Sequence, residues 1–326
     1  MARRLSFEGY DGSHPIAIQG IPAPLRGDGR AHSLVKALEI ALSHEGLALG
    51  YDVLMGLCGL AFRTPPWPHP PAPTAADVDE AVATLADALS GCMALHRYTE
   101  APTEDDVLDT VARAIDVEHL CVALGWGSEK DRWSVITGYD RGKTRLLGHC
   151  ALDAPRERYE AWPPILRVLV AITDRPRPRG PEAVEEALRR GAQRWEEDGA
   201  RLYAAWIEEL RLLEEPPGAE HEVAVELLAD ARAAAAGFAE GVAGFEPEVP
   251  AAWLTSAAEH WRELVLLLEA RGVPHSPEAL DAVETPEGRE DWANLLAIAA
   301  QHEEAAAAAV RQAHSVDYPP EEAAQW

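Results

Sequence analysis

Basic residues and cysteines are scarce in this chain of 326 residues. It contains 29 lysines and arginines against 55 aspartates and glutamates, which gives a formal net charge of −26. Such a surface repels phosphate backbones and anionic lipid headgroups, so we expect neither nucleic acids nor membrane surfaces as partners. The four cysteines are widely spaced and form no framework pattern, which argues against a disulfide-stabilised fold.

Long apolar runs are missing too. No stretch approaches the roughly 18 uninterrupted apolar residues of a membrane span, and the N-terminal residues lack the apolar core of a signal peptide. We therefore expect a cytoplasmic protein. The length suits two domains of about 150 residues each.

Motifs for metal ions and nucleotides are also lacking. His119 with Cys121, and His149 with Cys150, place potential ligands close together, but neither pair has a second pair at zinc-site spacing. The chain contains no Gly-x-x-x-x-Gly-Lys-Ser/Thr run and no Gly-x-Gly-x-x-Gly motif. We therefore expect no metal ion and no cofactor.

Two kinds of periodicity mark the first half of the chain. Apolar residues recur at helical spacing over residues 34–42, and they are dense over residues 51–62. A further helix is predicted to begin at Thr74 and to run toward Leu95. Short apolar runs separated by turn residues then predict strands, at residues 121–124, 133–139, 144–152 and 165–172. This order predicts an α+β domain over residues 1–174, with helices first and an antiparallel sheet after them.

The second half shows only helical periodicity. Residues 174–181 are rich in proline and arginine and are typical of a domain junction. Apolar stripes separated by proline and glycine breakers then predict an all-helical bundle of about five helices over residues 180–318, with a last helix at about 289–313. Residues 319–326 are expected to form a tail.

Two distant segments carry a family resemblance. One reads HSLVKAL from residue 32 and ends at Gly46, and the other reads RWSVITGYD over residues 132–140. Together they resemble the papain-like fold of the bacteriocin-processing cysteine peptidases and of the butirosin-biosynthesis-type N-terminal domain. Residues 51–63 also resemble a stretch of the butirosin-type relatives. The resemblance covers about residues 14–175 and implies a papain-like domain followed by a helical segment.

The chain departs from this family at the positions that would carry catalysis. The resemblance implies a nucleophilic cysteine at the start of the helix and a histidine at the start of the strand, but Ser33 and Arg132 occupy these positions. Asp153 matches the third member. An arginine cannot act as a base, because its pKa exceeds about 12. Two plainer roles remain open, a helix N-cap for Ser33 and a solvated strand-end position for Arg132.

We therefore expect a degenerate, non-catalytic papain-like protein that binds a small molecule or a carrier-linked acyl group, as an accessory protein in biosynthesis. An active acyltransferase or amide hydrolase of the butirosin-biosynthesis type is one alternative. The other is a structural or oligomeric protein, which would form a homodimer through the helical domain. The residues expected to contact the ligand are Ser33, Cys58, Trp126, Arg132, Trp133 and Asp153.

Overall fold

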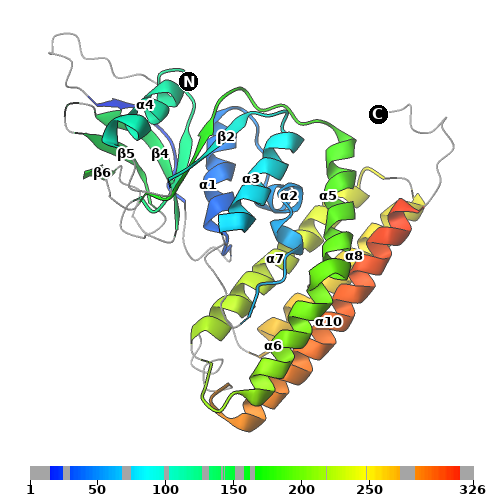
Figure 1. Cartoon of the computed structure of the whole chain (residues 1–326). Helices are drawn as coiled ribbons and strands as arrows, with labels where there is room; N and C mark the ends of the chain where they lie inside the picture. The colour runs from blue at the N-terminus through cyan, green and yellow to red at the C-terminus, as the bar shows by residue number, and fades with distance from the viewer. Residues whose placement is uncertain are drawn as a thin grey trace. The chain divides into compact units, whose positions relative to one another are not determined.

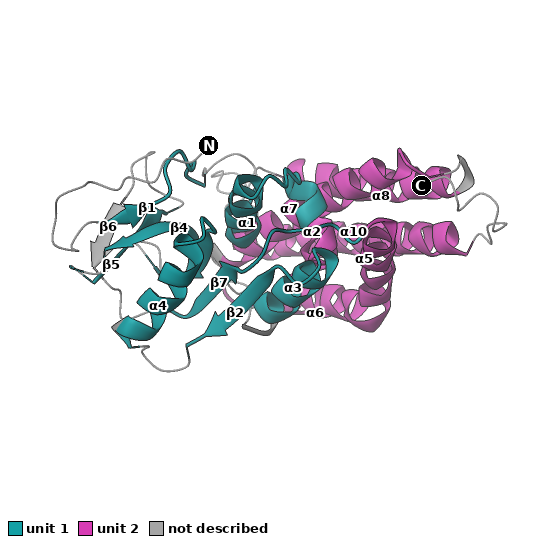
Figure 2. Cartoon of the chain, turned by 90° about the horizontal axis from the view of Figure 1, so that it is seen from above, with its two compact units in different colours: residues 1–54, 72–179 teal, residues 55–71, 180–326 magenta. Residues whose placement is uncertain are grey.

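The computed structural model divides into two compact units, shown in different colours in Figure 2. Residues 1–54 and 72–179 form the first unit, and residues 55–71 and 180–326 form the second. The structure describes residues 15–24, 30–67, 75–98, 103–126, 132–140, 142, 144–150, 158–161, 166–217, 219–246, 248–271 and 283–315. The sequence-based division places the segment 55–71 in the first domain, whereas in the structure it groups with the helices of the second unit.

The first unit contains helices and an antiparallel sheet, so its α+β class is confirmed (Figure 1). Its strands are β1 (Ile16–Ala17), β2 (Met93–Arg97), β3 (Cys121–Leu124), β4 (Trp133–Asp140), β5 (Arg145–His149), β6 (Arg158–Ala161) and β7 (Val168–Ile172). They lie in the order β2-β7-β3-β4-β5-β6, and β1 pairs with the C-terminal end of β4. Every described pairing is antiparallel.

The central strands are buried along their whole length. All residues of β3, β4 and β7 are buried, which requires cover on both faces of the sheet and explains their nearly continuous apolar sequences. The helices that begin in this unit are α1 (Ser33–His44), α2 (Tyr51–Leu57), α3 (Ala75–Ala88) and α4 (Glu104–Ile115). Helices α1 and α4 both pack against β3 and β4.

Strand β1 approaches β4 so closely that a side chain would not fit between them. Gly138 pairs with Ala17, and a Cβ atom on Gly138 would lie 2.2 Å from the carbonyl oxygen of Ile16. Real Cβ atoms do not approach an oxygen at this distance, so only glycine lets the two backbones meet.

The helix predicted from Thr74 toward Leu95 is too long. Helix α3 ends at Ala88, where Ser90 and Gly91 adopt positive φ angles of 63° and 76°. The Gly91 backbone N–H donates to the Ala86 carbonyl over 2.7 Å, a typical way to satisfy a carbonyl at a helix C-terminus. The chain then turns into β2, which pairs with β7.

The segment predicted as the junction is exposed but attached to the end of α3. The backbone N–H groups of Arg177 and Arg179 donate to the carbonyls of Leu89 and Ala88, over 3.3 and 3.0 Å. The Ser90 hydroxyl donates to the Arg177 carbonyl over 2.9 Å. These bonds hold the segment to the first unit.

The second unit contains only helical elements in its described residues. Its elements are a 3₁₀ turn η1 (Leu60–Phe62), α5 (Pro181–Arg194), a π-helical stretch (Trp195–Gly199), α6 (Ala200–Leu212), α7 (Ala219–Ala243), α8 (Glu248–Glu269) and α10 (Pro286–His314). Helix α10 packs against α8, α6 and α5, and α7 packs against α8 (Figure 1). The predicted last helix is confirmed. None of the described helices combines the length and the apolar content that a membrane span requires.

Phe62 explains why the segment 55–71 belongs with these helices. Its ring lies 6.3 Å from that of Phe238 and 5.7 Å from that of Trp261, measured between centroids. A Cβ atom on Gly191 would lie 2.6 Å from the Phe62 ring. The ring therefore packs directly on the backbone of α5 at this glycine. Burying an aromatic ring of this size contributes much of the stability of a small core.

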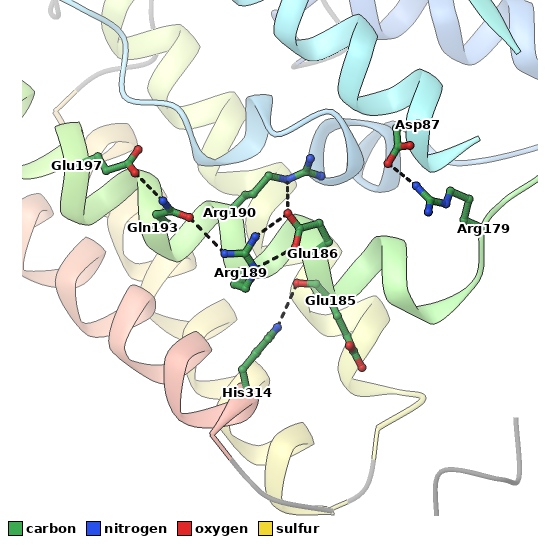
Figure 3. A network of polar contacts seen from close by, with 9 residues as sticks. All are labelled: Asp87, Arg179, Glu185, Glu186, Arg189, Arg190, Gln193, Glu197 and His314. Atoms are coloured by element: carbon green, nitrogen blue, oxygen red, sulfur yellow. Dashed lines mark hydrogen bonds and ion pairs between the residues drawn. The ribbon is translucent and has the colours of Figure 1, made fainter. Parts of the chain in front are cut away.

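The surface of α5 carries short-range polar pairs (Figure 3). Arg189 pairs with Glu186 over 2.7 Å, and the Gln193 amide donates to Glu197 over 2.6 Å. Exposed ion pairs of this kind contribute about 0–1 kcal/mol each. The apolar contacts of α5 therefore stabilise it more than these pairs do.

Candidate ligand-binding site

The two segments that carry the family resemblance meet in the first unit. The backbone N–H of Trp133 donates a hydrogen bond to Ser33 Oγ over 3.2 Å, between residues 100 positions apart. Ser33 is the first residue of α1 and Trp133 is the first residue of β4. The contact therefore joins the start of this helix to the start of this strand.

Ser33 does not cap its helix, so the predicted N-cap role is wrong. His32 occupies the N-cap position with φ −76° and ψ 93°, and its side chain makes no capping hydrogen bond. The first turn of α1 also contains no acidic residue. The partial positive charge of the helix start is therefore not compensated within α1, which favours an anion nearby.

Two residues that sequence reasoning missed hold the chain just before Ser33. The Tyr51 hydroxyl accepts a hydrogen bond from the His32 backbone N–H over 3.1 Å. The Arg30 guanidinium lies 4.8 Å from the centre of the Tyr51 ring and pairs with Glu39 over 3.1 Å. The only signal for Tyr51 was its place at the start of a predicted helix, and nothing in the sequence pairs it with His32.

The two predicted tryptophans lie in the core. Trp126 and Trp133 are both 0% exposed, so their rings contact protein. The Ser134 hydroxyl donates to the Trp126 carbonyl over 3.2 Å, which ties the segment after β3 to β4. Among the described residues, neither indole N–H has a hydrogen-bond partner. Arg132, by contrast, is half-buried and precedes β4 directly.

Cys58 belongs to the second unit, unlike Ser33, Arg132 and the two tryptophans. Its side chain is buried, and burial raises the pKa of the thiol to about 11. A thiol is the nucleophile only as its thiolate, so Cys58 is unreactive at neutral pH. Asp153 lies outside the described residues.

No base accompanies Ser33 in the part of the chain that the structure describes. Neither a histidine nor a carboxylate hydrogen-bonds to Ser33 Oγ there, and its partner is the backbone N–H of Trp133. A serine hydroxyl needs a base within about 3 Å to become a nucleophile. The described residues around Ser33 therefore include no group placed to activate the serine.

A buried ion pair forms a polar cluster within the second unit. Arg232 on α7 pairs with Glu303 on α10, and both side chains are almost fully buried. The Tyr203 hydroxyl and the Trp261 indole N–H also donate to Glu303, over 3.1 and 3.2 Å. The cavity beside this pair has a volume of about 10 Å³, about the space for one water molecule. The cluster therefore has no room for a larger ligand.

A second cluster in this unit is aromatic. The imidazole of His221 lies among three indoles, with centroid distances of 5.6 Å to Trp67, 5.7 Å to Trp206 and 4.8 Å to Trp292. Burial lowers the pKa of His221 to about 4. Neither ring nitrogen has a hydrogen-bond partner within the described residues, so the imidazole is neutral at neutral pH and packs as an aromatic ring.

No group of three or more His, Cys, Asp or Glu side chains is arranged to hold a metal ion in the described ranges. Comparisons with protein-family models and with curated proteins gave no match for this chain. The likeness of the first unit to the papain-like family therefore stays a prediction from its two matched segments.

Proposed function

We propose that the first unit is a degenerate papain-like domain that binds an anionic small molecule or a carrier-linked acyl group at the start of α1, without a covalent step. The hydrogen bond between Trp133 N–H and Ser33 Oγ carries this proposal. It joins the helix start and the strand start that supply the nucleophile and the base in the family that the sequence resembles.

The residues at these positions favour binding over catalysis. Arg132 stands at the position of the base, and an arginine side chain does not act as a general base. Ser33 has a backbone N–H as its partner where a base would be needed. The Cys58 thiol, whose pKa is raised to about 11 by burial, does not supply an alternative nucleophile.

The local charge favours an anion even though the chain as a whole is acidic. Arg132 has five N–H donors in a planar fork, so it can bind a carboxylate or a phosphate in bidentate fashion alongside other contacts. The first turn of α1 has no acidic residue. The helix start adds about half a positive charge.

Titration calorimetry with the full chain tests the ligand class. Carrier-linked acyl groups are attached to the carrier through a phosphopantetheine arm. The probe is therefore 4′-phosphopantetheine, and its control is pantetheine, which lacks the phosphate. We expect the phosphorylated probe to bind at least about tenfold more tightly, since hydrogen bonds to charged groups contribute about 1.5–3 kcal/mol. Arg132→Gln should remove this preference, whereas Arg201→Gln, on an exposed face of α6, should leave it unchanged. Equal binding of both probes would contradict the proposal.

Intact-mass analysis separates the binding protein from the enzyme. A fluorophosphonate probe and an acyl thioester should leave the mass of the protein unchanged. An adduct on Ser33 that disappears when His32 is replaced by Gln would overturn the non-catalytic reading in favour of an acyltransferase or hydrolase.

A double variant tests the scaffold itself. Ser33→Cys with Arg132→His places a thiol and an imidazole at the two matched positions. If these positions face each other as in the family, iodoacetamide should alkylate Cys at position 33 faster at pH 7 in the double variant than in Ser33→Cys alone, because the imidazole stabilises the thiolate. Equal alkylation rates would argue against a papain-like arrangement.

A further inference from the structure

A groove lies in the first unit beside α4, β2 and β7. Its volume is about 270 Å³, near the lower end of the range for small-molecule sites. The residues that line it include Ala94, His96, Thr110, Arg113, Val117 and His119. They come from the edge strand β2, from α4 and from the turn that follows α4.

This groove is separate from the start of α1. His119 Nδ1 and Glu45 Oε1 are 3.0 Å apart, and Glu45 is the C-cap of α1. Because α1 has 12 residues, its two ends lie roughly 18 Å apart at 1.5 Å per residue. The groove therefore lies toward the end of α1 opposite Ser33, and a ligand bound there does not occupy the site proposed above.

Arg113 brings a positive charge to the groove. Its Nε donates to the Asp109 carbonyl over 3.2 Å and its Nη2 donates to Thr110 Oγ1 over 3.3 Å. Among the described carboxylates none forms an ion pair with Arg113, although the chain has a net charge of −26. The other N–H donors of the guanidinium can bind an anion in the groove.

His96 faces the same groove from β2. Burial and the nearby charge of Arg113 both lower the pKa of its imidazole, so His96 is neutral at neutral pH and can donate or accept a hydrogen bond. A bound anion would offset the charge of Arg113 and raise the pKa of His96. His119, which also lines the groove, has its Nδ1 3.0 Å from Glu45 Oε1.

The rest of the lining is small and apolar. Ala94, Ala114, Ala171 and Ile172 form its walls, and Val117 leaves 61% of its surface exposed at the groove. Covering exposed apolar surface with an apolar group stabilises the complex by about 25 cal/mol per Å². A ligand with one charged end and a short apolar body matches this combination.

We infer that this groove binds a short amphipathic carboxylate, with the carboxylate on Arg113 and the apolar chain along Ala94, Ala171 and Val117. A single guanidinium with a neutral imidazole suits one negative charge better than the two of a phosphate monoester. The volume of about 270 Å³ suits a small ligand with a short chain.

The experiment compares hexanoate, hexanamide and hexan-1-ol as probes of the full chain, with binding followed by NMR through the imidazole signal of His96. The signal is assigned with His96→Gln. Hexanoate should bind about tenfold more tightly than the two neutral probes and should raise the pKa of His96. Arg113→Gln should weaken hexanoate about tenfold and leave hexan-1-ol unchanged, whereas the control Arg201→Gln should change neither.

Two further variants keep the test decisive. Ala94→Leu should fill the groove and weaken all three probes, and Val117→Ser, at an exposed position, should do the same more mildly if Ala94→Leu fails to fold. Arg132→Gln should not affect hexanoate. Equal binding of hexanoate and hexan-1-ol, or hexanoate binding that is lost with Arg132→Gln and kept with Arg113→Gln, would overturn the inference. The second outcome would leave the site at the start of α1 standing.

Discussion

The polar cluster of the helical unit and the start of α1 use the same side-chain types in opposite ways. Arg232 is 1% exposed and spends its donors on protein acceptors, namely Glu303, the carbonyls of Ala61 and Arg63, and the Thr64 hydroxyl. Arg132 is half-buried, and the neighbouring Ser33 hydroxyl binds only a backbone N–H among the described residues. Arg232 is therefore a buried structural residue, whereas Arg132 lies partly at the surface.

The buried pair shows what a structural ion pair needs. Removing two ions from water costs several kcal/mol per ion, and only good geometry with further hydrogen bonds offsets this cost. Glu303 meets that condition, because Arg232, Tyr203 and Trp261 all donate to it. The cluster also fixes residues 61–64 to α7 through Arg232, which adds to Phe62 in holding that segment to the helices.

The largest expected effect comes from breaking the closed cluster. Glu303→Gln keeps the shape but leaves the charge of Arg232 buried without a counter-ion, so it should lower the free energy of unfolding by about 3–5 kcal/mol. Urea unfolding followed by circular dichroism measures this change. Glu259→Gln, at an exposed position of α8, is the matched control and should change the stability by less than about 0.5 kcal/mol.

A double variant shows whether the loss comes from the unpaired charge. Arg232→Met with Glu303→Leu removes both charges and should recover most of the stability lost in Glu303→Gln. If Glu303→Gln is as stable as the natural protein, the cluster does not hold the helical unit together and the contrast with Arg132 fails.

The next effect tests the backbone that positions β4 in the first unit. Gly138→Ala brings a Cβ atom to 2.2 Å from the Ile16 carbonyl oxygen, so β1 must move away from β4. The cost should be about 3 kcal/mol, the upper end of the usual range for overpacking.

Gly241→Ala is the control for this substitution. Gly241 lies within α7 with nothing within 4 Å of an added Cβ, so alanine there should stabilise the protein by about 0.5–1 kcal/mol. Thermal unfolding should therefore shift in opposite directions for the two variants. A shift in the same direction would show that the close contact of β1 with β4 carries no strain when a side chain is added.

His221 is buried like Arg232, but it packs among aromatic rings and has no hydrogen-bond partner in the described residues. Its folded pKa of about 4 lies below the ordinary value of 6.5, so the unfolded chain binds the proton first as the pH falls. Stability from this group is full above pH 6.5 and is lost as the pH falls toward 4. Between pH 7 and pH 5 the loss should be about 2 kcal/mol.

His221→Phe isolates this contribution. Phenylalanine fits an aromatic surrounding and does not titrate, so the variant should match the natural protein at pH 7 and lose about 2 kcal/mol less than it between pH 7 and pH 5. Urea midpoints at the two pH values provide the measurement. Parallel losses in both proteins would assign the acid sensitivity to carboxylates elsewhere.

Periodicity predicted most elements of the fold because local spacing reflects burial. The strands at residues 121–124 and 133–139 and the last helix agree with the structure. Strand β2 was missed, since Met93–Arg97 follows a helical pattern and becomes a strand only through pairing with β7. The grouping of residues 55–71 with the helices was missed for a similar reason, because it depends on contacts of Phe62 with distant rings.

The candidate site was predictable only in part. The matched segments led to Ser33 and Arg132, and the contact at Trp133 fits that pairing. Exposure could not be read from residue type, because Trp133 looks the same on a surface as in a core. The groove at Arg113 had no sequence signal, since its residues come from segments whose proximity depends on tertiary packing.

The smallest expected effect concerns the hydroxyl that joins α1 to β4. Ser33→Ala removes the acceptor of the Trp133 N–H, and a net loss of one hydrogen bond should lower the free energy of unfolding by about 1 kcal/mol. Ser33→Thr keeps the hydroxyl and should lose less. Hydrogen exchange of the Trp133 amide gives a local readout, with faster exchange in Ser33→Ala than in Ser33→Thr. If both variants exchange like the natural protein, the helix start and the strand start are held together by other contacts, and the hydrogen bond does not define the site.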